Sequence, residues 1–320
     1  MLSIFLVTFP FFALVLAGYV AARRRMLPLD AIPGLNGFVL YFALPCMLYR
    51  FGANTPIEQL LNGSLVAVYM LCAVVLVLFT IAVTHAASRG RMDWNDASFG
   101  ALVAAFPNTG FMGVPLLVAL LGAQAAGPAI VTIMVDMVIT SSLCIALSRL
   151  DGADEHGAAR AARMALKGVV RNPLPWAIAL GTLASGLGFA LPTPLMATVN
   201  LLADAASPVA LFTIGAVLAR SQMNSSAQTP LADYVPVVLI KLVLHPVLLG
   251  LLGLAAMALG LPLDRFTLTV VVLLAALPSA SNVALLAERF EADNGRIARI
   301  ILLSTVLAFF SFPAAVALLK

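Results

Sequence analysis

The sequence predicts an all-α integral membrane protein with ten transmembrane helices, arranged as a 5+5 inverted repeat. Three observations support this fold class: an apolar composition, a series of apolar segments long enough to cross a bilayer, and a matched pair of helix-breaking segments. Of the 320 residues, 62% are hydrophobic and only 10% are charged, and the mean hydropathy is +1.06. A soluble domain has roughly 45–50% apolar and about 25% charged residues, so this chain has too little polar surface to face water on all sides.

The apolar segments predict the number of membrane crossings. A membrane-crossing helix needs about 20 mostly apolar residues. Ten segments meet this requirement: 2–22, 33–51, 63–87, 96–122, 127–148, 170–190, 195–219, 232–260, 265–288 and 297–319. The connections are short, and the longest is a polar loop at 150–168 that we expect in the cytoplasm. No segment suits a soluble domain, so we expect one membrane unit over residues 1–320.

The basic residues predict the orientation of this unit, because cytoplasmic loops carry an excess of Lys and Arg. With the N-terminus outside, 14 basic residues lie at cytoplasmic ends: Arg23, Arg24, Arg25, Arg89, Arg91, Arg149, Arg160, Arg163, Lys167, Arg171, Arg220, Arg289, Arg296 and Arg299. The opposite ends hold three, Arg50, Arg265 and Lys320. We therefore predict an inner-membrane protein with both termini on the non-cytoplasmic side. A secretory signal carries its positive charges before the apolar stretch, so we expect the first span to be retained.

Two halves of the chain repeat each other on either side of the polar loop. The fourth span begins after Asp93 and contains Pro107, the ninth begins after Asp264 and contains Pro278, and both pairs are 171 residues apart. Five spans per half is an odd number, so the second half inserts upside down relative to the first. This architecture recurs in transporters, whose sites lie near the midplane where discontinuous helices meet. Chance similarity between apolar helices is the alternative.

The fourth span carries the clearest helix break. Residues 107–115 read Pro-Asn-Thr-Gly-Phe-Met-Gly-Val-Pro, and two prolines with two glycines cannot continue a regular helix. The ninth span has a related segment at 277–282, Leu-Pro-Ser-Ala-Ser-Asn. Unpaired backbone at membrane depth is tolerated only where it is buried in protein or lines a cavity. We expect the broken spans to cross around a polar solute, with a packing kink as the alternative, above all in the ninth span.

The expected ligand is a small anionic or strongly polar solute. Because the two broken spans run in opposite directions, each break places one half-helix N-terminus near the midplane. The N–H groups and the partial positive charge at such an end favour an anion, and asparagines add donors and acceptors without a buried charge. The predicted substrate-binding residues are Pro107, Asn108, Thr109, Gly110, Pro278, Ser281 and Asn282.

Three ionisable residues within spans are candidates for ion or proton coupling, because such groups are costly in a bilayer. Asp136 either binds a proton or a sodium ion, or holds the break in the fourth span by hydrogen bonds. Lys241 and His245 are four residues apart and share one helix face. Lys241 either pairs with Asp136, attracts the substrate, or extends to the cytoplasmic interface. His245 either relays protons or satisfies a kink at the following proline.

The segment at 107–115 resembles the signature of the auxin efflux carrier family, which includes plant auxin exporters and many bacterial permeases. The segments at 40–45 and 277–287 are similar to the same family, and the likeness extends over the whole chain. In the family, asparagines beside the crossing prolines contact the substrate carboxylate, and these correspond to Asn108 and Asn282. Plant members carry a long hydrophilic loop between spans 5 and 6 that this chain lacks. The resemblance therefore implies a bacterial permease for malate, malonate or a related carboxylate.

The resemblance also implies a domain organisation, similar to that of sodium/bile acid symporters and sodium/proton antiporters. Spans 1, 2, 6 and 7, at 1–62 and 169–222, would form a scaffold that dimerises. Spans 3–5 and 8–10, at 63–149 and 231–320, would form a mobile transport domain with the crossed spans 4 and 9 inside it.

The sequence thus predicts a secondary active transporter or facilitator of small organic anions that works by alternating access. A proton- or sodium-coupled exporter of another small metabolite and a non-transporting membrane sensor are the alternatives. Paired catalytic aspartates, a Ser–His arrangement and a His-Glu-x-x-His motif are missing from the sequence, so we do not expect an enzyme. We also expect no metal and no cofactor beyond a coupled ion. The expected partners are the substrate, the lipid bilayer and a second copy of the chain, with no nucleic acid.

Overall fold

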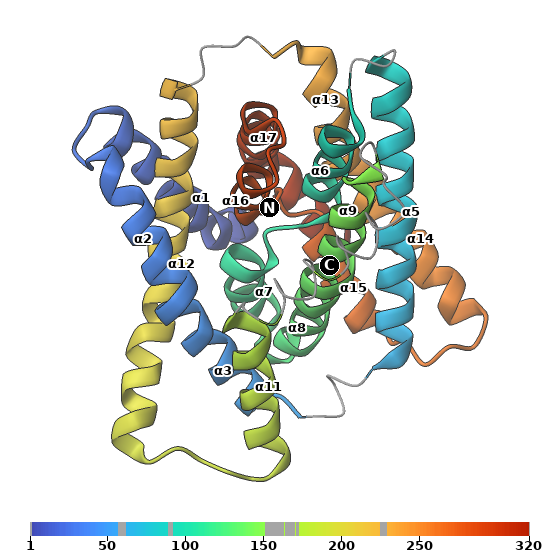
Figure 1. Cartoon of the computed structure of the whole chain (residues 1–320). Helices are drawn as coiled ribbons and strands as arrows, with labels where there is room; N and C mark the ends of the chain where they lie inside the picture. The colour runs from blue at the N-terminus through green and yellow to red at the C-terminus, as the bar shows by residue number, and fades with distance from the viewer. Residues whose placement is uncertain are drawn as a thin grey trace. The chain divides into compact units, whose positions relative to one another are not determined.

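The computed structural model describes residues 2–56, 62–88, 92–150, 163, 170, 173–224 and 229–319. All the named secondary-structure elements of this described part are helices (Figure 1), so the all-α fold class is confirmed. The predicted polar loop at 150–168 lies outside the described residues, apart from Leu150 and Arg163. Several basic residues used to predict the orientation lie outside them too.

Seven helices of the described residues are long and apolar enough to cross a membrane: Ile4–Arg23, Leu29–Asn54, Gly63–Ala86, Ala123–Leu147, Thr193–Met223, Leu231–Ala258 and Asn294–Leu319. They coincide with predicted spans 1, 2, 3, 5, 7, 8 and 10. Predicted spans 4 and 9 appear as shorter helices because each is interrupted near its middle. Predicted span 6 is described at Val170 and from Pro173 onward. The chain is therefore a multi-pass α-helical membrane protein.

The chain folds into two compact units. The first comprises Met1–Asn62, Thr109–Val131 and Asn172–Asn224, and the second comprises Gly63–Asn108, Thr132–Arg171 and Ser225–Lys320. The helices of the first unit are α1 (Leu2–Arg23), α2 (Ile32–Phe38), α3 (Leu44–Asn54), α7 (Val114–Leu121), α11 (Pro173–Gly186) and α12 (Thr193–Asn224). A π-helical turn at Val39–Ala43 joins α2 to α3, and a second one at Thr109–Gly113 precedes α7.

Small residues allow α1 and α12 of the first unit to lie side by side (Figure 1). A Cβ atom on Gly18 would lie 1.8 Å from the carbonyl oxygen of Phe212. Reciprocally, a Cβ on Gly215 would lie 1.8 Å from the carbonyl oxygen of Val15. Only hydrogen fits between these two backbones, so the pair of glycines sets how closely the helices approach.

Glycines also allow close packing of α3 against α11 within that unit. A Cβ on Gly52 would lie 3.1 Å from the carbonyl oxygen of Ile178, and one on Gly181 would lie 2.4 Å from that of Tyr49. Two helix pairs of the first unit are thus packed through glycines. Close approach of this kind is typical of membrane helices, where association depends on van der Waals packing rather than on the hydrophobic effect.

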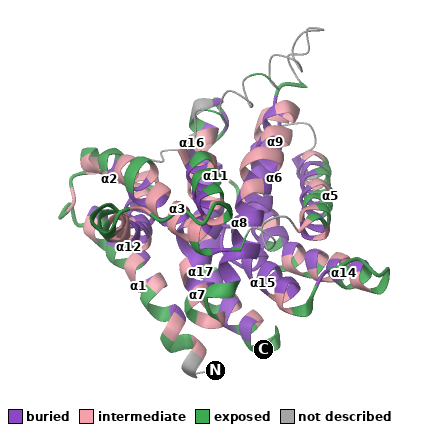
Figure 2. Cartoon of the chain, turned by 90° about the horizontal axis from the view of Figure 1, so that it is seen from below, coloured by how far each residue is buried: buried purple, intermediate pink, exposed green. Residues whose placement is uncertain are grey.

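The helices of the second unit surround two short buried ones. Its members are α5 (Gly63–Ser88), α6 (Trp94–Ala105), α9 (Ser141–Leu147), α13 (Leu231–Leu239), α14 (His245–Ala258), α15 (Arg265–Ala275), α16 (Asn282–Arg289) and α17 (Asn294–Leu319). The helix α8 (Ala126–Val135) begins in the first unit and ends in the second. Figure 2 shows α6 and α15 as largely buried: nine of the twelve residues of α6 and eight of the eleven residues of α15 are buried.

The two buried helices begin in the same way. The side chain of Asp93 caps α6 by accepting a hydrogen bond from the backbone N–H of Asp96, and that of Asp264 caps α15 by accepting one from Thr267. An aspartate at this position satisfies an otherwise unpaired N–H group and interacts favourably with the helix dipole. The two caps therefore fix the residues at which α6 and α15 begin.

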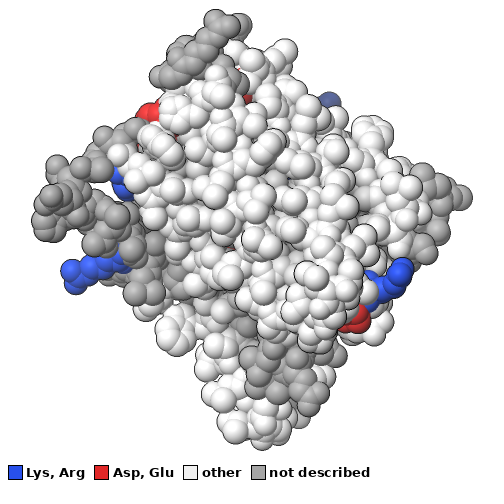
Figure 3. Space-filling view, turned by 90° about the vertical axis from the view of Figure 1, so that its right-hand side faces the viewer, with Lys and Arg blue, Asp and Glu red and all other residues white. Residues whose placement is uncertain are grey.

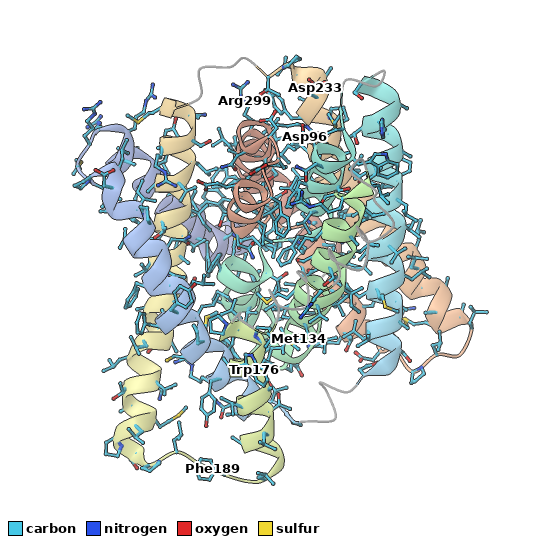
Figure 4. The ribbon with its side chains drawn as sticks, in the orientation of Figure 1. Asp96, Met134, Trp176, Phe189, Asp233 and Arg299 are labelled. Atoms are coloured by element: carbon cyan, nitrogen blue, oxygen red, sulfur yellow. The ribbon has the colours of Figure 1, made fainter. Side chains whose placement is uncertain are left out.

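A buried arginine ties together three helices at the capped end of α6. Arg296 of α17 is only 2% exposed. Its Nε donates to the carbonyl oxygen of Asp233 at 2.7 Å, and its Nη1 donates to that of Asp96 at 2.9 Å. Gly100 leaves room for the guanidinium, because a Cβ there would lie 2.8 Å from both terminal nitrogens. Figure 4 shows Asp96 and Asp233 at this end of the unit.

The outer surface has the character of a membrane protein. The face shown in Figure 3 is almost entirely uncharged, and its few described Lys, Arg, Asp and Glu atoms lie toward the margins. Large apolar side chains are exposed on the outer helices, including Leu6, Leu180, Leu201, Leu251 and Phe310. In water such a surface would drive association, whereas in a bilayer it faces lipid.

Candidate functional site

The two predicted helix breaks meet within the second unit. After α6 ends, residues 106–108 are extended and pair with residues 278–280, which follow α15, in an isolated antiparallel bridge centred on Pro107 and Ser279. The backbone N–H of Asn108 donates to the carbonyl oxygen of Pro278 at 2.9 Å, and that of Ala280 donates to the carbonyl oxygen of Phe106 at 3.0 Å. Each break therefore supplies hydrogen-bond partners to the other.

This pairing suits the two prolines. Proline has no N–H to donate, and the bridge takes its donors from Asn108 and Ala280, whereas Pro278 contributes only a carbonyl oxygen. The N–H of Ser279 is also paired, because it donates to the hydroxyl of Ser304 at 3.2 Å. Unpaired backbone groups cost several kcal/mol in a membrane interior, so these contacts make both breaks tolerable.

Polar side chains at the breaks retain unused hydrogen-bonding capacity. Asn108 is 4% exposed and Ser279 is 1% exposed. The hydroxyl of Ser279 and the side-chain oxygen of Asn282 are buried and have no hydrogen-bond partner in the part of the chain that the structure describes. Ser281 precedes α16 but does not cap it through its side chain. Buried polar groups in proteins are normally paired, so these oxygen atoms are suited to contacts with a bound solute.

Two of the predicted site residues fall in the first unit. Thr109 begins the π-helical turn that follows the break, and its buried hydroxyl has no partner among the described residues. Gly110 is next, and nothing lies within 4 Å of the position that its Cβ would occupy. Their role in binding stays a prediction from the sequence.

Asp136 lies at the centre of a buried polar group in the second unit. It is fully buried and begins a π-helical turn, Asp136–Thr140, between α8 and α9. One carboxyl oxygen accepts from the hydroxyl of Tyr69 at 2.8 Å, and the other accepts from Thr140 at 3.0 Å. Ser141 bonds to the backbone carbonyl of Asp136. π-Helical turns often occur at functional sites.

Lys241 and His245 form a second buried group. Lys241 lies in another π-helical turn, Ile240–Leu244, and its Nζ donates to the carbonyl oxygen of Ala275 at 2.7 Å. The same Nζ lies 3.1 Å from Nδ1 of His245. Both side chains are at most 1% exposed. The expectation that Lys241 extends to the cytoplasmic interface is therefore wrong, because a carbonyl at the end of α15 holds its ammonium group inside the unit.

Direct pairing of Lys241 with Asp136, another of the alternatives for Lys241, is not observed either. Within the described part of the chain, no ion pair joins these two side chains. They are close enough to interact electrostatically, and the aromatic ring of Tyr69 lies 6.4 Å from that of His245. Tyr69 thus neighbours both polar groups.

Several residues of these groups were missed in the sequence. Tyr69 is one aromatic residue in a long apolar span, and nothing in its pattern indicates a contact 67 residues away with Asp136. Ser279 was part of a recognised break but was not assigned to the site. The backbone carbonyl of Ala275 has no sequence signal of its own. Among the described residues, no group of three His, Cys, Asp or Glu side chains is placed to hold a metal ion.

Comparison with known proteins assigns the family. The sequence pattern of the family described as "Membrane transport protein" matches residues 3–316. The chain belongs to this family. Its match to auxin efflux carriers confirms the resemblance inferred from the fourth span: it is 27% identical to auxin efflux carrier component 4 of Arabidopsis thaliana over 125 residues, 39% of this chain and 20% of that carrier.

Bacterial family members match over nearly their whole length. A relative from Rhizobium meliloti, named "Putative malonate transporter", is 30% identical over 299 residues, which cover 93% of this chain and 90% of the relative. The uncharacterized transporter YfdV of Escherichia coli strain K12 is 28% identical over 285 residues, 88% of this chain and 87% of YfdV. The family consists of transporters, so the chain is a membrane transporter.

Proposed function

We propose that this transporter moves small organic anions, such as malonate or malate, by alternating access, either driven by a coupled ion or as a facilitator. The substrate binds beside the bridged breaks at Pro107, Asn108, Pro278, Ser281 and Asn282. The observation that carries the proposal is the bridge itself, which brings two interrupted helices together at a place lined by buried, unpaired side-chain oxygens. The name of the relative from Rhizobium meliloti supports the choice of substrate class.

We further propose ten spans in a 5+5 inverted repeat, with spans 4 and 9 crossing at the breaks. Two sets of matching features support this. The helix caps Asp93 and Asp264 are 171 residues apart. In the glycine-packed helix pairs, Gly18 matches Gly181 and Gly52 matches Gly215, each with a spacing of 163 residues, as an inverted repeat requires.

The ends of the half-helices support an anion. Three helix ends of the second unit lie near the bridge: α6 and α15 end there, and the helix α16 begins there. C-terminal helix ends favour cations and N-terminal ends favour anions. The carbonyl at the end of α15 is already occupied by Lys241. The N-terminal side is therefore the part of this arrangement that suits an incoming carboxylate.

The remaining parts of the proposal concern the setting of the protein. We place it in the inner membrane with both termini on the non-cytoplasmic side, and we propose a homodimer through the helices at 1–62 and 169–222, which act as the scaffold. The segments 63–149 and 231–320 act as the transport domain. Asp136, Lys241 and His245 are the proposed coupling residues.

Reconstitution into liposomes tests the proposal. Purified protein is expected to exchange external labelled malonate or malate for the same anion trapped inside, which requires a carrier but no net driving force. If none of a panel of mono- and dicarboxylates moves under exchange or under any ion gradient, the carrier proposal fails and the membrane-sensor alternative gains support. If only a neutral metabolite moves, the exporter alternative is correct.

Asparagine variants locate the substrate site. Loss of one hydrogen bond to a charged group costs about 1.5–3 kcal/mol, so Asn108→Ala and Asn282→Ala are each expected to weaken malonate affinity about ten- to a hundredfold. Asn36→Ala, which removes an amide from α2 in the first unit, is the matched control and should bind as wild type. Unchanged affinity in both break variants would place the site elsewhere.

A further inference from the structure

One neighbouring helix contacts the ends of both buried half-helices through basic side chains. Lys241 donates to the carbonyl of Ala275 at the end of α15, and the buried ring of His245 faces the backbone of Ala104 near the end of α6. Ala104 and Ala275 are 171 residues apart, the same spacing as the two caps at the other ends of these helices. We name these two side chains with their two carbonyls the carbonyl clamp. It sits at equivalent places in both halves of the repeat.

The hydrogen bonds of the carbonyl clamp define its charge. An ammonium group only donates, so when Lys241 is charged Nδ1 of His245 accepts from it. The other ring nitrogen then carries the hydrogen of the neutral imidazole, on the side that faces the backbone of Ala104. In this tautomer His245 is neutral. The lone pair of Nδ1 is used in the contact with Lys241, so it is not available for another proton. The clamp therefore holds one positive charge, on Lys241, at a helix C-terminus where a cation is favoured.

Asp136 provides the balancing negative charge. It accepts from two neutral hydroxyls, Tyr69 and Thr140, and has no ion-pair partner among the described residues. The other ionisable groups of the described residues that face the two charges are cysteines: Cys72 faces both Lys241 and Asp136, and Cys144 faces Asp136. A buried charge without a counter-charge is costly. One buried ammonium can balance one buried carboxylate, and before substrate binds that carboxylate is Asp136.

An arriving organic anion upsets this balance. Ala275 lies three residues before Pro278, whose carbonyl accepts the N–H of Asn108, so the carbonyl clamp and the bridged breaks are joined by a short stretch of backbone. The single positive charge of Lys241 then has to balance two carboxylates, that of Asp136 and that of the substrate. When two carboxylates share one site, one of them is driven to take a proton.

We infer that Asp136 takes up one proton when an organic anion binds beside Asn108 and Asn282. A hydronium ion from bulk water transfers its proton to a carboxylate oxygen of Asp136, a new O–H bond forms, and water is left. The Asp136 charge is lost as the substrate charge arrives, so the buried charge stays balanced. The inference rests on the proposed anion site, and it assigns the coupling ion as a proton rather than sodium.

Calorimetry of the purified full-length protein tests this. Malonate binding is measured at slightly alkaline pH, where both malonate carboxyls are ionised, in buffers that differ in ionisation enthalpy. The dependence of the observed heat on that enthalpy gives the number of protons taken up. About one proton per malonate is expected, together with about a tenfold loss of affinity per pH unit as pH rises. Replacing sodium with choline should change nothing.

Variants test whether Asp136, rather than another group, takes up the proton. Asp136→Asn should bind malonate without proton uptake and without pH dependence. Asp204→Asn is the control, because it removes an exposed carboxylate of the first unit that pairs with Arg50 at 2.7 Å, and it should behave as wild type. If Asp136→Asn does not fold, Tyr69→Phe removes one donor to the carboxylate, and it should move the pH dependence of malonate affinity to higher pH.

The outcomes distinguish the inference from the proposed function. Malonate binding whose heat is independent of the buffer, in wild type, would overturn proton uptake and leave the anion site standing. Proton uptake that persists in Asp136→Asn, or an unmoved pH dependence in Tyr69→Phe, would overturn the role of Asp136. If neither malonate nor malate binds wild type, the proposed function fails, and the inference fails with it.

Discussion

Replacing Gly18 with alanine is expected to force α1 and α12 apart. The added carbon would lie 1.8 Å from the carbonyl oxygen of Phe212, whereas ordinary van der Waals contact begins at 3.4 Å. The helices must therefore separate by about 1.6 Å at this point, because the obstructing atom belongs to the main chain and cannot rotate away.

The size of the effect follows from two opposing contributions. Alanine is favoured over glycine within a helix by about 1 kcal/mol, whereas overpacking costs about 1–3 kcal/mol and sometimes more. The overlap here is with rigid backbone, so we expect a net loss of about 2 kcal/mol or more for Gly18→Ala and for Gly215→Ala. Gly181→Ala should cost less, because its obstructing atom lies at 2.4 Å, and Gly52→Ala, at 3.1 Å, should cost least.

Thermal unfolding in detergent measures this order of stabilities. It is monitored as the loss of the monodisperse size-exclusion peak after heating. Gly37→Ala in α2 is the matched control, since nothing lies within 4 Å of its Cβ position, and it should be as stable as wild type or more so. The reasoning is refuted if Gly18→Ala unfolds at the same temperature as Gly37→Ala, or if Gly52→Ala has the lowest unfolding temperature of the series.

Three other substitutions test the fold. Gly100→Ala should displace the guanidinium of Arg296 and lower stability by about 2 kcal/mol, as expected for lost hydrogen bonds to a charged group; adding Arg296→Met should then cost little more, and full additivity in thermal unfolding would contradict this contact. Asp264→Ala should cost about 1 kcal/mol at neutral pH through loss of the helix cap. Partial burial raises the pKa of Asp264, but hydrogen bonds from the first turn of α15 outweigh this and hold the pKa below its usual value of 3.8. The cap therefore stabilises the fold above that value and loses its contribution as pH falls through the folded pKa, and Asp264→Asn should keep the cap while removing this part of the acid sensitivity. Separating Arg50 from Asp204 by Asp204→Asn should change stability by less than about 1 kcal/mol, because the aspartate side chain is 69% exposed; a larger shift in the unfolding temperature would show that this pair is shielded from water.

The helix breaks were predictable because proline acts locally. Pro107 and Pro278 each remove a backbone donor wherever the rest of the chain lies, so the sequence locates both interruptions. The family was predictable for the same reason, since its signature is a continuous segment at 107–115. The bridge was not predictable, because it depends on two segments about 170 residues apart meeting in one register.

The surroundings of the buried charged residues could not be predicted from sequence patterns. Lys241 lies ten residues into its span, and that position alone is compatible with an interfacial lysine. What keeps it inside is a carbonyl oxygen at the end of α15, and a backbone acceptor carries no residue signature. Arg296 was counted with the cytoplasmic charges, yet its guanidinium is enclosed because Gly100 on another helix leaves space for it. Such complementarity arises only from tertiary packing.

The mutual pairing of the two breaks has a consequence for biosynthesis. The N–H of Asn108 and the carbonyl of Phe106 find their partners in residues 278–280, which the ribosome adds only after most of the chain has been made. Until then these two groups lack the partners that they have in the folded protein, and unpaired backbone groups are costly inside a membrane. The N-terminal half therefore cannot reach its final form ahead of the C-terminal half. Maturation of this transporter waits for residues 278–280.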